Sequence, residues 1–157
     1  MPAFALTQPV GVGLGWQEPF AGVSPAGGVG FTFVCDGRGI RRLTSLVFTL
    51  TTSADVADRV VTVEYQGGDG LSYSVNGNPT AVTASLTQRF AASMQTVQGG
   101  TLTTTDLYFP LDPVFLFPGD SLRILVANQS ATDALTAIRG VLERYPLDSD
   151  LLPTRED

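Results

Sequence analysis

The sequence predicts an all-β protein, folded as an antiparallel β-sandwich of about eight strands that follows an extended N-terminal arm. The first observation is composition: 17 Gly and 10 Pro in 157 residues supply many tight turns, and the many Thr residues suit pleated strands. The second is that 43% hydrophobic and 15% charged residues describe a globular chain, neither disordered nor a long helix. A third is alternation of apolar and polar residues from Ile40 onward. The length suits one domain.

Residues 1–28 form the predicted arm, because they are rich in Gly and Pro and carry irregularly spaced apolar side chains. Four of these side chains, Phe4, Leu14, Trp16 and Phe20, are candidate interface residues. An arm this apolar either packs on its own domain or lies on a neighbouring subunit, and the sequence favours neither alternative.

The predicted sandwich spans residues 29–146, and its strands are separated by short turns. The alternating apolar residues are Leu46, Phe48 and Leu50 in one strand and Val61, Val63 and Tyr65 in the next. Predicted turns fall at residues 53–58, 66–70, 76–79, 98–100 and 118–120. Residues 108–117 are the most apolar stretch of the chain, and the Pro-Gly-Asp turn at 118–120 follows them.

The last element of the sandwich is ambiguous. Leu135, Ile138, Leu142 and Tyr145 have helical spacing behind a plausible helix cap at residues 132–133. Gly140 weakens a helix, and the preceding strands leave a sheet position to fill, so a strand is favoured. Residues 147–157 form an acidic C-terminal tail.

The charge pattern argues against nucleic-acid and anionic-membrane partners. The net charge is −6, and the nine cations are all Arg, scattered along the chain without a basic stripe. The single cysteine, Cys35, cannot form an internal disulfide; we expect a buried, inert thiol and a reducing compartment. No signal peptide or transmembrane segment is predicted at the N-terminus.

The sequence predicts no enzymatic activity and no cofactor or metal. It contains no His, which excludes Ser-His-Asp and Cys-His catalysis and His-ligated metals, and one Cys cannot make a zinc site. Carboxylate pairs are the remaining catalytic option. The candidates are Asp55 and Asp58, Asp112 and Asp120, and Asp69. All lie in predicted turns, where Asp commonly bonds the backbone. Asp55, Asp58 and Asp69 could share a Ca²⁺, but no calcium-loop spacing is present.

Four aromatic residues are candidates for a sugar-binding face, namely Trp16, Tyr65, Tyr73 and Tyr108. Each lies in an apolar context, so packing in the core or against a subunit is the favoured interpretation. The Gly-rich residues 11–15 lack the third glycine of a dinucleotide-binding loop and are interpreted as flexible arm.

Four stretches carry a resemblance to a known family: IRRLTSLVFTLTTS at 40–53, ADRVVTVE at 57–64, FPGDSLRI at 117–124 and RGVLERY at 139–145. Together they resemble small β-sandwich virion proteins of tailed bacteriophages, of the type that decorates or cements the capsid. The resemblance implies a jelly-roll-like sandwich without active-site residues. It also implies self-association, often as trimers, and docking on the major capsid protein at local symmetry axes. Such a protein is made in the host cytoplasm and ends on the capsid exterior.

The resulting hypothesis is a capsid decoration protein that stabilises the head by bridging major capsid subunits. Two alternatives stay open: a receptor- or carbohydrate-binding module of a tail or fibre, and a head-tail or tail component. The first alternative requires a solvent-facing aromatic cluster with convergent polar groups.

Overall fold

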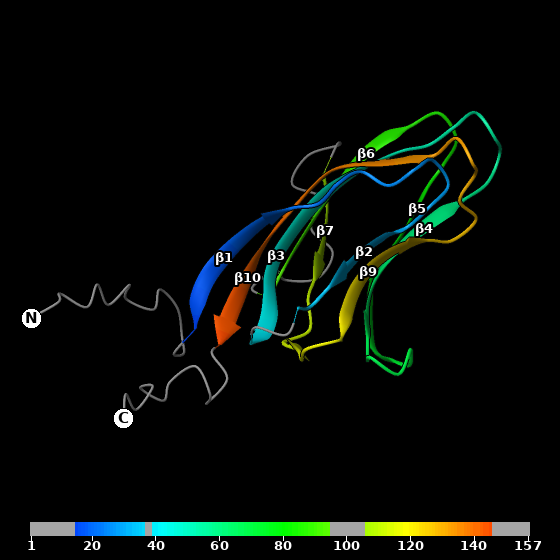
Figure 1. Ribbon diagram of the computed structural model, residues 1–157. Helices are drawn as coiled ribbons and strands as arrows, with labels where there is room; N and C mark the ends of the chain where they lie inside the picture. Colours follow the sequence, from blue (N-terminus) through cyan, green and yellow to red (C-terminus); the bar gives the residue numbers. More distant parts are fainter. Residues whose placement is uncertain (1–14, 37–38, 95–105, 146–157) are drawn as a thin grey trace, which may run out of the picture.

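The computed structural model describes residues 15–36, 39–94 and 106–145, which form ten β-strands (Figure 1). The strands are β1 (Trp16–Ala21), β2 (Phe31–Val34), β3 (Ile40–Thr51), β4 (Arg59–Gln66), β5 (Ser72–Val82), β6 (Thr87–Ser93), β7 (Asp106–Pro110), β8 (Phe115–Leu116), β9 (Ser121–Val126) and β10 (Ala134–Tyr145). Across these ranges there is no helix that could span a membrane. Phe4, Leu14 and the predicted tail at 147–157 lie outside the described residues.

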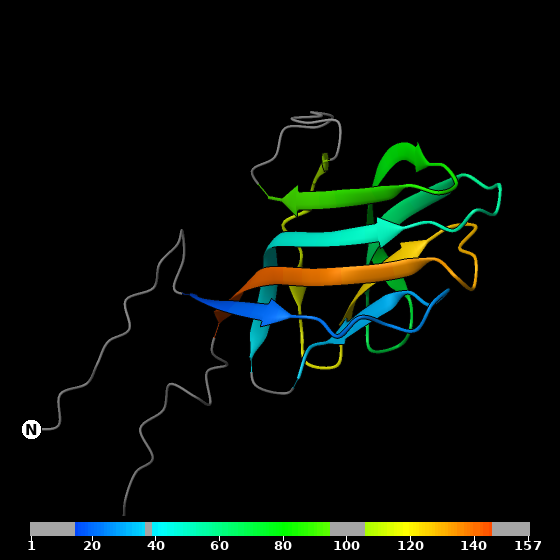
Figure 2. The same cartoon turned by 90° about the horizontal axis from the view of Figure 1, so that it is seen from above.

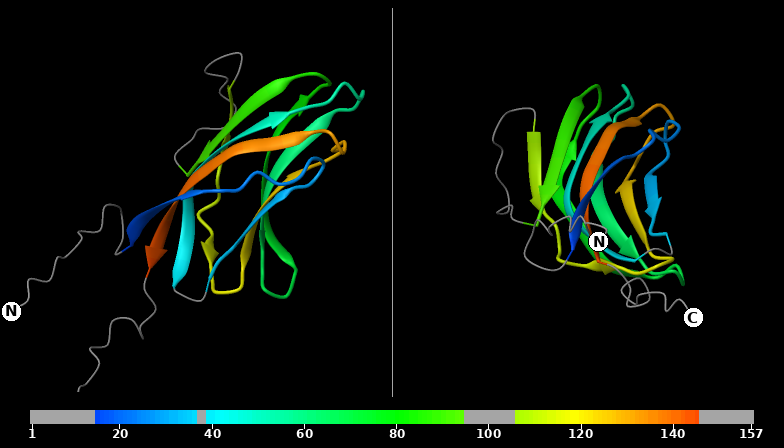
Figure 3. Two further views of the ribbon diagram at one scale, coloured as in Figure 1. Left: turned by 45° about the horizontal axis from the view of Figure 1, so that its top comes forward. Right: turned by 60° about the vertical axis from the view of Figure 1, so that its left-hand side comes forward.

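The strands form two sheets that face each other (Figure 3). The larger sheet has the order β1-β10-β3-β6-β7, and the short strand β8 also pairs with β3. The smaller sheet has the order β2-β9-β4-β5. Figure 2 shows the larger sheet from above, with β10 lying between β1 and β3.

This strand order is that of an eight-stranded jelly roll. Four antiparallel pairs are nested along the chain, β1 with β10, β2 with β9, β3 with β6, and β4 with β5, and they are distributed over two four-stranded layers. Strands β7 and β8 are additions within the connection from β6 to β9. The predicted all-β sandwich is therefore confirmed, with two short strands beyond the eight.

One pair departs from the antiparallel pattern. Strands β6 and β7 run parallel, with Phe90 opposite Leu107. Twelve residues separate the end of β6 at Ser93 from the start of β7 at Asp106, which is enough chain for a crossover.

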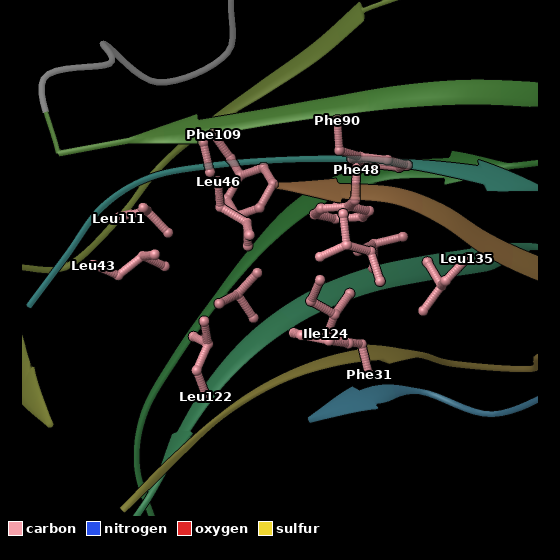
Figure 4. Close-up of a cluster of buried hydrophobic side chains, with 14 of the residues drawn as sticks. Phe31, Leu43, Leu46, Phe48, Phe90, Phe109, Leu111, Leu122, Ile124 and Leu135 are labelled. Carbon is pink, nitrogen blue, oxygen red and sulfur yellow. The ribbon is translucent and has the colours of Figure 1, made fainter. Parts of the chain in front are cut away.

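The core lies between the two sheets and is filled mainly by inward-facing residues of β3, β4, β6, β7, β9 and β10 (Figure 4). Leu46, Phe48 and Leu50 of β3 are fully buried, as the alternation predicts. Phe48 stacks on Phe90, its partner on β6, with ring centroids 5.1 Å apart. Each such side chain stabilises the fold by about 1.5–3 kcal/mol through its removal from water.

The last element is a strand, as favoured, and its helical spacing has a structural cause. Leu135, Ile138 and Leu142 of β10 are all buried, although an uninterrupted strand would turn Leu135 and Ile138 to opposite faces. The pairing with β3 shifts between Thr136 and Arg139, where Ala137 has a φ of 51°. This β-bulge brings both side chains to the core face.

Residues 16–21, which the sequence analysis places in the arm, form strand β1 at the edge of the larger sheet. They pair along β10 from Trp16 opposite Arg144 to Ala21 opposite Arg139. Phe20 turns inward and packs against Phe33 of β2, with ring centroids 5.2 Å apart. This described part of the arm packs on its own domain.

Candidate docking surface

The carboxylates considered for catalysis serve turns. Asp55 accepts hydrogen bonds from the hydroxyls of Ser53 and Ser130, and these bonds lower the pKa of Asp55. Asp58 is exposed and its carbonyl accepts a bond from Asn128. The carboxylate of Asp55 thus bonds hydroxyls within and beside its own turn, a common role for Asp in turns.

The other turn carboxylates are also committed to nearby groups. Asp69 accepts from the amide of Leu71 at 3.0 Å, and Asp112 accepts from the hydroxyl of Ser74 at 2.7 Å. Among the described residues, no three His, Cys, Asp or Glu side chains gather as metal ligands.

A buried ion pair fixes the end of the sandwich where β3 turns into β4 and β9 turns into β10. Arg59 and Asp133 are both fully buried, with Nε 2.9 Å from Oδ2. Asp133 also accepts bonds from the amides of Ser53 and Ser130. Burial alone would raise the pKa of Asp133, but the bonds from Arg59 and the two amides outweigh it and lower the pKa to about 2. The pair ties two loops together and serves structure.

Cys35 is buried, as expected for a structural thiol. The guanidinium of Arg41 contacts its sulfur at 3.3 Å and bonds Asp36 at 2.7 Å and Glu18 at 3.0 Å. Arg41 thereby joins β1, β3 and the segment after β2. These contacts hold the two strands and that segment together.

The opposite end of the sandwich carries a row of aromatic and Arg side chains. Arg42 lies over the rings of Phe115 and Tyr145, 5.4 and 5.8 Å from their centroids, and these two rings meet edge to face at 5.6 Å. Beside them, Arg144 lies 5.1 Å from the ring centroid of Trp16. The row runs from β8 across β3 and β10 to β1.

A hollow opens at this same end, and we call it the end groove. It has a volume of about 470 Å³. Its lining residues are Gly67, Gly68, Asp69, Leu71, Ser72, Tyr73, Phe115, Phe117 and Asp120. The exposed fractions are 70% for Leu71, 47% for Tyr73, 40% for Phe115 and 53% for Phe117. The turn from β4 to β5 and the segment around β8 therefore present one leucine and three aromatic rings to solvent.

The carboxylate of Asp120 holds the two walls of the end groove together. It accepts hydrogen bonds from the amides of Gly68 and Phe117, at 3.1 and 2.9 Å, and from the hydroxyl of Tyr73 at 3.2 Å. Burial and the nearby Asp120 carboxylate raise the pKa of Tyr73, so its hydroxyl stays protonated and donates. The groove is thus formed in advance of any partner.

The structure places the candidate residues from the sequence in different environments, some exposed and some buried. Trp16 is 37% exposed at the groove end, whereas Phe20 faces the core. Of the candidate sugar-binding tyrosines, Tyr65 is fully buried, Tyr108 is half-buried on β7, and Tyr73 alone lines the end groove.

Leu71, Phe115 and Phe117 are not among the site residues predicted from the sequence. The signal was present in the apolar stretch before the Pro-Gly-Asp turn, where buried Leu116 lies between two exposed rings. Alternation alone could not show which neighbours share a face, because that depends on the pairing of β8 with β3.

Comparison with known proteins adds a distant likeness. No family model and no curated protein matches the sequence. One chain of the T13 IBDV viral particle aligns with TM-score 0.41 and 12% identity over 93% of this chain and 37% of its own length. A chain of the infectious bursal disease virus Gx strain aligns with TM-score 0.31 and 12% identity over 98% and 47%. This chain spans less than half of either, and the jelly-roll assignment depends on the strand order alone.

Proposed function

We propose that this protein is a structural component of a bacteriophage particle that binds the outer surface of the capsid as a decoration or cement protein. Its partners are then the major capsid protein and further copies of itself, with a trimer favoured. The end groove is the observation that carries the proposal, because it is a preformed apolar surface whose polar atoms bond one another. Such a surface suits docking on a protein better than chemistry on a substrate.

The fold and the composition support the same proposal. Jelly rolls occur in viral capsid domains and in lectins, although a fold by itself does not fix a function. Only 15% of residues are charged, and a surface with few charges is commonly covered in an assembly. The family resemblance at residues 40–53 and 117–124 points to the outside of the capsid.

A carbohydrate- or receptor-binding module of a tail or fibre is the second candidate. The exposed rings of Tyr73, Phe115 and Phe117 favour it, because sugars stack on aromatic faces. The polar groups beside them argue against it. Asp120 is engaged by three donors, and the hydroxyl of Ser72 donates to Glu64. A sugar also requires convergent polar groups that are available to it.

Quantitative mass spectrometry of purified particles from the source tests the proposal. We expect a copy number close to that of the major capsid subunit. A few copies per particle would assign the chain to the tail, the head-tail junction or a vertex, and its absence from particles would overturn the virion assignment. Binding to a glycan array would support the carbohydrate module instead.

A further inference from the structure

The end groove leaves four apolar side chains in solvent, and one segment of this chain has the chemistry to cover them. We propose that residues 1–14 fold back across the end of the sandwich and fill the end groove of the same molecule, with Phe4 and Leu6 as the anchoring side chains. This inference concerns the protein on its own and goes beyond the proposed function. It describes the free protein: the docking on a capsid proposed above uses the same groove and would require residues 1–14 to leave it.

The segment leaves the sandwich at the same end as the groove. Strand β1 starts next to the end of β10, at the lower end of Figure 1, where the turns into β5 and β9 also lie. A side chain at Gly15 would come within 3.0 Å of the Tyr145 ring. Tyr145 in turn meets Phe115, which lines the groove. A continuous aromatic surface thus leads from residue 15 to the groove.

The length of the segment fits this path. Three strand spacings separate β1 from β8 across β10 and β3, which amounts to about 14 Å, and the other sheet lies about 10 Å further. Residues 7–14 in extended form cover about 26 Å. This leaves Phe4 and Leu6 at the groove.

The chemistry of the segment matches the groove. Residues 1–14 contain no charged side chain, so none of their side chains must be desolvated as an ion on docking. They offer apolar side chains at Phe4, Leu6, Val10 and Leu14. Pro2 and Pro9 lack amide hydrogens, which favours docking by side chains over a regular added strand. The groove offers rings and a leucine, with its carboxylate Asp120 already bonded.

The C-terminal residues are the competing occupant, since they leave the sandwich at the same end after Tyr145. Residues 146–157 contain apolar side chains, but they also carry four carboxylates against one arginine. The groove itself contains the carboxylates of Asp69 and Asp120. Like charges at close range disfavour docking of this tail.

Disulfide trapping in dilute solution tests the proposal on the full chain. The double variant Ala5→Cys/Ser72→Cys places one thiol between the two anchors and one on the groove wall. The matched control is Ala5→Cys/Val34→Cys, because Val34 is an exposed site at the end of β2 that pairs with Ser121. The native Cys35 is buried and contributes little.

We expect an intramolecular disulfide to Ser72→Cys that forms about tenfold faster than to Val34→Cys, since docking an apolar side chain shifts a closed-to-open ratio by about that factor. Adding Phe4→Ser and Leu6→Ser should remove the preference. Equal rates at the two sites would overturn the proposal. Disulfides that form only between molecules would also overturn it and would assign the groove to a second copy. Faster trapping in Ser149→Cys/Ser72→Cys would overturn it as well and would assign the groove to the C-terminal tail.

Discussion

At the scale of single residues, the buried pair of Arg59 and Asp133 is the most consequential contact for stability. Both side chains are inaccessible to solvent, and the carboxylate accepts bonds from the guanidinium and from two backbone amides. A buried ion pair contributes little relative to an apolar pair of the same size, but removal of one partner leaves an uncompensated charge. The pair therefore makes the two loops depend on each other.

Asp133→Asn should lower the free energy of unfolding by about 3–5 kcal/mol at neutral pH, because Arg59 stays buried without its counter-ion. The cost should shrink in acid. The pKa of Asp133 is about 2 in the folded protein and near 3.8 when unfolded. Its charge therefore stabilises the fold above pH 4, by roughly 2 kcal/mol, and this contribution is lost as the pH falls towards 2. Urea unfolding at several pH values measures both effects.

Asp55→Asn is the matched control for this prediction. Asp55 lies in the neighbouring turn and is exposed, so its loss should leave the stability close to that of the unmodified protein. An Asp133→Asn variant as stable as the control would contradict the structural role given to the buried pair.

At the scale of elements, Gly140 controls how β1 attaches to the larger sheet. A Cβ at this position would lie 2.4 Å from Cε1 of Phe20 and 2.8 Å from the carbonyl oxygen of Ser45. The ring of Phe20 therefore occupies the space that any side chain on Gly140 would need. The close fit of β1 on β10 depends on this glycine.

Gly140→Ala should destabilise the protein by about 1–3 kcal/mol through overpacking. We expect hydrogen exchange to rise mainly in residues 16–21, while β4 and β9 stay protected. Arg139→Ala, an exposed change one residue away on the same strand, is the control. Uniform loss of protection in all strands would show that β1 does not detach as a unit.

The elements also show what the sequence could predict. Period-two alternation located β4 and the second half of β3, because every other residue is buried from Arg59 to Tyr65 and from Leu46 to Leu50. It failed to distinguish helix from strand in β10, because the bulge at Ala137 gives buried residues a spacing of three. The groove was beyond prediction, since Tyr73 and Phe115 come together only when the two sheets stack.

At the scale of the whole molecule, the two ends of the sandwich differ in character. One end is fixed by the buried ion pair of Arg59 and Asp133, and the other carries the end groove and the aromatic row. The net charge of −6 is spread over the chain without a basic patch. If the proposed function holds, attachment to a particle should be mainly apolar.

Binding of the protein to particles stripped of it should then change little with salt. Raising NaCl from about 0.1 M to about 1 M shortens the screening length from about 10 Å to about 3 Å, which weakens exposed ion pairs and leaves apolar contacts intact. A sedimentation assay with purified particles measures the bound fraction. A steep loss of binding with salt would indicate a charged docking face and would exclude the groove end as the main contact.

The nested strand order also determines when this chain can fold. Strand β10 lies in the interior of the larger sheet, between β1 and β3, although it is the last of the described strands along the chain. While the chain is being synthesised, β1 has no sheet neighbour and β3 has one edge unpaired until residues 134–145 have left the ribosome. Contacts between such distant parts of a chain form slowly. The sandwich is therefore completed only after residues 134–145 have emerged, and until then its core is incompletely covered.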